Sequence, residues 1–72
     1  MSEFNYEIVR HLATLSDDGY GHTLQVNFIS YNGGKPKLDI RRWQGDRMFK
    51  GVALNDEEAE ALYKALEEWT NV

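Results

Sequence analysis

Three glycine-containing turns most constrain what this 72-residue chain can fold into. They lie at 17–21 (DDGYG), 32–34 (NGG) and 44–46 (QGD), and Gly, Asn and Asp are the residues that tolerate the positive φ such turns require. The segments between the turns alternate apolar and polar residues, which indicates strands. We therefore predict four hairpin-linked strands, at Tyr6–Ser16, Thr23–Tyr31, Lys37–Trp43 and Met48–Leu54.

Two of these strands depart from strict alternation. The first has apolar residues in both phases, such as Ile8 and Val9, so either both of its faces are partly covered or a bulge switches the phase. The last alternates so weakly that the pattern does not place Phe49 or Lys50 on either face.

An amphipathic helix follows the last strand. Asn55 is a favoured N-cap residue, and Glu58 can complete a capping box with it. One apolar stripe at helical spacing should cover the sheet, and it comprises Ala59, Leu62, Tyr63, Leu66 and Trp69. Tyr63 and Trp69 of this stripe are expected in core or dimer packing. The order ββββα predicts an α+β class, with one C-terminal helix on a curved, four-stranded antiparallel sheet, and a single domain over residues 1–72.

A second contact surface is predicted on the same helix, because one sheet needs only one stripe. This surface is the flank of the helix next to Trp69, and its residues are Ala61, Ala65, Trp69 and Val72. A partner copy of the helix is the simplest occupant, so we expect a homodimer. A chain this short buries only about 60% of its unfolded surface, and without cysteine it has no disulfide to compensate.

The formal net charge of −4 hides an uneven distribution. Residues 55–72 hold one Lys against six Asp or Glu, whereas residues 35–50 hold six Lys or Arg against two Asp. Salt screens each charge within about 8–10 Å, so a local basic surface can bind polyanions although the helix is acidic.

The basic segment also carries an aromatic residue in phase with an arginine. Asp39, Arg41 and Trp43 alternate onto one face, away from Leu38 and Ile40, and Arg41 and Trp43 are about 7 Å apart along the strand. A basic groove with aromatic platforms is how proteins bind single strands without sequence preference. The alternatives are that Trp43 belongs to the core or an interface, and that Arg41 simply pairs with Asp39 or with a Glu of the helix.

Several segments resemble a known family. LDIRRW and FKGVALNDEEAEAL look like the single-stranded-DNA-binding domain of the transcriptional coactivator positive cofactor four. ISYNG, KLDIR and KGVALNDEEA resemble the short bacterial YdbC-like relatives more closely. The likeness covers residues 4–70 as a pattern and is most specific from Ile29 to Leu62. It departs at 44–46, where the eukaryotic domain has a longer basic, proline-containing loop.

This resemblance implies a ββββα homodimer that binds single-stranded DNA in sheet grooves, without a catalytic centre. Together with the charge pattern, it indicates these contact residues: Tyr31, Lys35, Lys37, Arg41, Trp43 and Lys50. We expect no enzyme activity, no cofactor and no metal. The implied role is handling exposed single strands in transcription, replication or repair, in the cytoplasm and in association with the nucleoid.

Other functions stay open at this point. The basic hairpin could dock an acidic protein partner, or the groove could bind single-stranded RNA. The set His11, Asp17, Asp18 and His22 could come together around one turn, but it matches no metal-ligand spacing. No segment approaches the ~20 apolar residues of a membrane helix, and the N-terminus does not resemble a signal peptide.

Overall fold

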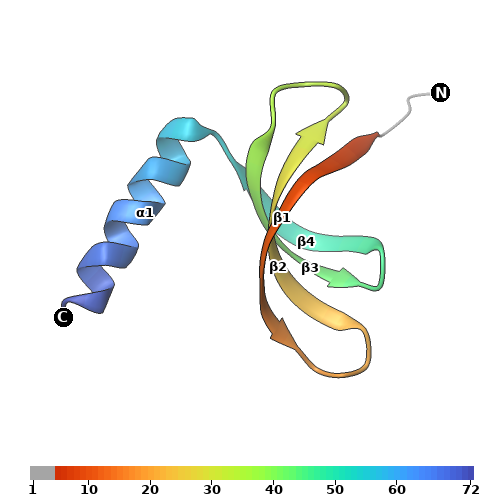
Figure 1. Ribbon diagram of the computed structural model, residues 1–72, viewed down its shortest axis with the longest axis horizontal. Coiled ribbons are helices and arrows are strands. Elements are labelled where there is room, and N and C mark those ends of the chain that lie inside the picture. The colour runs from red at the N-terminus through yellow and green to blue at the C-terminus, as the bar shows by residue number, and fades with distance from the viewer. Residues whose placement is uncertain (1–4) are drawn as a thin grey trace.

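The computed structural model describes residues 5–72, which form one antiparallel sheet followed by one helix (Figure 1). The strands lie side by side in chain order, β1 to β4. The elements are β1 (Tyr6–Asp17), β2 (His22–Tyr31), β3 (Lys37–Gln44), β4 (Arg47–Leu54) and α1 (Asp56–Thr70). The predicted ββββα architecture is confirmed.

Bulges account for both strands with irregular patterns. The pairing of β1 with β2 shifts register three times, the first time between Ile8 and Arg10. In β4, Phe49 and Lys50 together oppose the single residue Arg42 of β3. Of the two explanations that the pattern of β1 left open, the structure shows the bulge. Each bulge bends its strand and increases the local twist, and the sheet is strongly twisted and curled (Figure 1).

The two faces of the sheet differ in burial. Residues that pair directly across β2 and β3 share a face, and we name the two faces after residues of β3. The Asp39 face carries Gln25, Asn27, Ile29, Tyr31, Lys37, Asp39, Arg41 and Trp43, and the Ile40 face carries Leu24, Val26, Phe28, Leu38, Ile40 and Arg42. Every buried side chain of the described residues lies on the Asp39 face: Asn27, Ile29, Asp39 and Trp43. The Asp39 face is therefore the inside of the curl.

The helix begins as the sequence predicts. The Asn55 side chain accepts a hydrogen bond from the Glu58 amide, and the Glu58 side chain accepts one from the Asn55 amide, at 2.8 and 2.9 Å. These two bonds satisfy backbone donors that the first helical turn leaves without partners.

The expectation that α1 packs along the sheet is wrong within one chain. The helix projects away from the strands (Figure 1), and none of its residues is buried. Only Asn55, in an extended conformation, separates the end of β4 from the start of α1, so the chain has no room to turn back. Trp69, placed by the pattern on the covered stripe, is 71% exposed. No helix within residues 5–72 has the length and apolar character needed to cross a membrane.

Candidate nucleic-acid interface

A buried carboxylate organises the middle of the Asp39 face. Asp39 has no solvent-exposed surface, and its two oxygens accept hydrogen bonds from Nε and Nη2 of Arg41 at 2.7 and 2.8 Å. The Tyr31 hydroxyl donates a third, short hydrogen bond to Asp39 Oδ2. Asp39 and Arg41 share the face because they are two residues apart in β3, and Tyr31 reaches them from the end of β2.

The opposite charges of Arg41 and Asp39 lie within one hydrogen-bonded cluster. Burial, and then the hydrogen bond to Asp39, raise the pKa of Tyr31 to about 12. The hydrogen bonds to Asp39 also raise the pKa of Arg41 above its ordinary value. The phenol therefore stays neutral, while the guanidinium and the carboxylate cancel each other's charge.

Gly51 makes room for the arginine. A Cβ added at Gly51 would lie 1.9 Å from the Arg41 Cβ and 2.4 Å from the Ile40 carbonyl oxygen. With that space open, Arg41 lies across β4 and donates from Nη1 to the Phe49 carbonyl at 3.0 Å. Gly51 was not among the predicted functional residues, although a glycine inside a strand often marks such a close approach.

Trp43 is buried, so the expectation that it offers an exposed stacking platform is wrong. Its side chain is 2% exposed, and its ring lies 6.0 Å from that of Tyr6. In the strand pairing, Tyr6 lies opposite Tyr31, and Trp43 lies opposite Thr23. Tyr31 and Thr23 are eight residues, or about 26 Å, apart along β2. Only a strongly curled sheet brings these diagonal corners together. The Tyr6 hydroxyl completes the contact by bonding to the Asp46 carbonyl at 3.4 Å.

A second polar chain supports the buried Asn27. His11 Nδ1 lies 2.6 Å from Asn27 Oδ1, and the Asn27 amide donates to Gln25 at 3.1 Å. Gln25 in turn donates to Thr23 at 2.8 Å. These bonds satisfy an amide that would otherwise be costly to bury, so their role in this chain is structural.

The two histidines have different partners. His11 bonds to Asn27, whereas His22 Nδ1 lies 2.8 Å from Asp18 Oδ2 in the first turn. The amide of Tyr20, and then His22, hold the pKa of Asp18 below its ordinary value. No group of three or more possible metal ligands occurs in the part of the chain that the structure describes.

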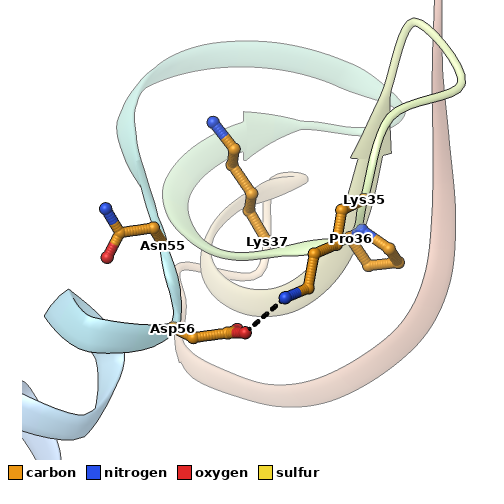
Figure 2. Close-up of a pocket in the computed structure, with 5 residues that line it drawn as sticks. All are labelled: Lys35, Pro36, Lys37, Asn55 and Asp56. Atoms are coloured by element: carbon orange, nitrogen blue, oxygen red, sulfur yellow. Dashed lines mark hydrogen bonds and ion pairs between the residues drawn. The ribbon is translucent and has the colours of Figure 1, made fainter.

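Lys35 and Lys37 diverge at the start of β3. Lys35 donates to the Asp56 carboxylate at 2.6 Å, which raises the pKa of Lys35, and both side chains are exposed. Figure 2 shows that the Lys37 ammonium group points away from Asp56, although both lysines line the same hollow beside Asn55. Lys37 is therefore available to an external anion, whereas Asp56 partly offsets the charge of Lys35.

The sheet carries further exposed cations. Five Lys or Arg side chains of the strands are exposed and form no ion pair within residues 5–72: Arg10, Lys37, Arg42, Arg47 and Lys50. The Arg47 guanidinium lies 5.6 Å from the centre of the Phe49 ring, which is 42% exposed. None of Arg42, Arg47 and Phe49 was among the predicted contact residues. Alternation places Arg42 on the phase of Leu38 and Ile40, which indicates a side chain over the core, whereas the structure leaves it exposed. The weak alternation of β4, which contains a bulge at Phe49 and Lys50, did not place Phe49 on either face.

Four of the six predicted contact residues lie on the Asp39 face, namely Tyr31, Lys37, Arg41 and Trp43, but the six do not form one exposed patch. The structure joins Tyr31 and Arg41 through Asp39, and it buries Trp43. Lys35 and Lys37 lie beside the start of α1, and Lys50 lies in the bulge of β4.

Comparison with known proteins gives one informative relative. No protein-family model matches the chain. Its sequence is 45% identical over 62 residues to an "Uncharacterized protein" of Treponema pallidum (strain Nichols), and the match covers 83% of this chain and 73% of that protein.

Proposed function

We propose that this chain, which belongs to the same family as the Treponema pallidum protein, binds single-stranded DNA as a homodimer. The supporting observation is how charge is distributed in the structure. Residues 5–54 carry seven Lys or Arg and five Asp or Glu. Residues 55–72 carry one Lys and six Asp or Glu. Because α1 projects from the sheet (Figure 1), the acids beyond its first turn lie away from the exposed strand cations.

The exposed cations suit a flexible polyanion. A single strand loses a condensed counterion for each phosphate that a protein cation neutralises, and this release drives binding at low salt. Screening over about 8 Å at physiological salt keeps the acids near the end of α1 from cancelling the strand cations, because the helix is about 22 Å long.

Aromatic contacts would come from residues other than Trp43. Phe49 is partly exposed beside Arg47, and Tyr31 is half-buried next to Arg41. Stacking of one base on one aromatic ring contributes about 1–3 kcal/mol, and every base has a face to stack. Binding should therefore depend little on sequence.

A second copy of the chain would complete the core. Within residues 5–72, Ile29 and Trp43 are the only buried apolar side chains, which is very few for a stable domain. Large apolar side chains stay exposed on α1, among them Tyr63, Leu66 and Trp69, and the small Ala61 and Ala65 beside them would let another helix approach closely. A homodimer joined through α1 removes this surface from water.

The cellular role that follows is binding of exposed single strands during transcription, replication or repair in the cytoplasm. Charge-neutral variants test the binding surface directly. Lys37→Gln and Lys50→Gln should each weaken binding to labelled oligo-dT in fluorescence anisotropy. Lys64→Gln is the matched control, because Lys64 is an exposed lysine on the acidic helix. Equal effects of all three substitutions, or none, would contradict a binding surface on the sheet.

A further inference from the structure

We propose that Asp39 is a positioning residue of the DNA-binding surface: it fixes the Arg41 guanidinium and cancels its charge. Arg41 then binds the strand through directional hydrogen bonds and not through counterion release. This inference rests on the proposed function, since it assigns a role to a residue that would not itself touch the DNA. It divides the basic residues of the sheet into two kinds with different salt dependence.

The hydrogen-bond inventory of Arg41 shows what a ligand can still use. A guanidinium has five N–H groups. Asp39 accepts from Nε and from one N–H of Nη2, and the Phe49 carbonyl accepts from one N–H of Nη1. At most two N–H groups therefore remain, one on each terminal nitrogen, and the Tyr31 hydroxyl also interacts with the guanidinium. The Arg41 side chain is 15% exposed, so a nucleic acid would bind a donor that Asp39, Phe49 and Tyr31 leave available.

The guanidinium is held before any ligand arrives. Two parallel hydrogen bonds to one carboxylate fix the plane of an arginine, and the absence of a side chain at Gly51 lets it lie across β4. The Tyr31 hydroxyl holds the same carboxylate from the other strand. The conformational entropy of the arginine is thus lost on folding, so binding does not have to fix it again.

The charge of Arg41 is cancelled within the protein, whereas the charges of the exposed lysines are not. The carboxylate, the guanidinium and the neutral phenol form a group of zero net charge, whereas Lys37 and Lys50 are exposed and have no ion-pair partner within residues 5–72. Each phosphate neutralised on a single strand contributes about 0.7 to the slope of log K against log salt. Lys37 should therefore contribute about 0.7 to that slope if it contacts a phosphate, and Arg41 should contribute almost nothing.

The test is an anisotropy titration of fluorescein-labelled oligo-dT at four salt concentrations. Arg41→Lys keeps the charge and can still pair with Asp39, but it lacks the planar fork. Its affinity should fall about five-fold at every salt concentration, with the slope unchanged, as expected for loss of a hydrogen bond of about 1 kcal/mol. Lys37→Gln should instead lower the slope by about 0.7. Asp39→Asn should raise the slope, because the Arg41 charge is no longer cancelled.

Circular dichroism first establishes that each variant is folded. Asp39→Asn changes a buried group, and if it unfolds, Arg41→Lys still decides the question because it keeps the buried ion pair. Wild-type affinity in Arg41→Lys, or an unchanged slope in folded Asp39→Asn, would overturn the role of Asp39 and leave the proposed function intact. Failure of the wild-type protein to bind any single strand would overturn both.

Discussion

Replacing Trp43 with alanine should strongly destabilise the protein. The indole is 98% removed from solvent, since its exposed fraction is 2%. Truncating a buried tryptophan to alanine costs about 3–5 kcal/mol. Domains are stable by about 0.05–0.15 kcal/mol per residue, which gives about 4–11 kcal/mol for this chain. The substitution should therefore remove a large share of the free energy of unfolding.

Replacing Trp43 with phenylalanine should change the stability by a different amount from replacing it with alanine. The indole Nε1 of Trp43 is buried without a hydrogen-bond partner among the described residues. A buried donor without a partner costs about 1–3 kcal/mol, and Trp43→Phe removes that donor while keeping an aromatic ring against Tyr6. Trp43→Phe should consequently lose much less stability than Trp43→Ala.

Urea denaturation followed by far-UV circular dichroism measures both effects. The matched control is Tyr20→Ala, which truncates an aromatic ring that is 85% exposed and should change stability by no more than about 0.5 kcal/mol. If Trp43→Ala unfolds at the same urea concentration as Tyr20→Ala, the indole is not part of the core, and a role in stacking bases returns.

Three further predictions follow from the packing and the charges. Gly51→Ala should destabilise the fold by about 1–3 kcal/mol in the same urea assay, because its Cβ would overlap Arg41. Ala65→Glu should give monomer or aggregate in light scattering, and an unchanged dimer would count against pairing through α1. The folded state raises the pKa of Tyr31 from 10.0 to about 12, so its neutral phenol stabilises the fold fully below pH 10. That stabilisation should be lost as the pH rises from 10 to about 12, and Tyr31→Phe should not show this part of the loss.

Strand order and helix start were predictable because both are encoded locally. The glycine turns fix where hairpins reverse, and Asn55 with Glu58 encodes the first turn of α1. Apolar residues in both phases of β1 indicated either a bulge or partial cover of both faces, and the structure shows bulges. Such features depend on a few neighbouring residues and require no knowledge of the rest of the fold.

The predictions that were wrong concern features that depend on contacts between residues distant in the sequence. Trp43 is buried because the sheet curls until Tyr6 reaches it, and no alternation pattern encodes the amount of curl. The stripe on α1 is typical of a helix that packs on its own sheet, but the connection through Asn55 alone directs the helix away. Alternation did place Asp39 and Arg41 on one face, and it could not show that the carboxylate would be buried beneath Tyr31.

The measurement that tests the account most directly is the binding of wild-type protein to labelled oligo-dT in fluorescence anisotropy, at two salt concentrations, with duplex DNA of the same length as control. Tight binding to the single strand that weakens with salt, and little binding to the duplex, is the predicted result. No binding to the single strand at tens of micromolar would contradict it, and the exposed cations of the sheet would then need a protein partner to explain them.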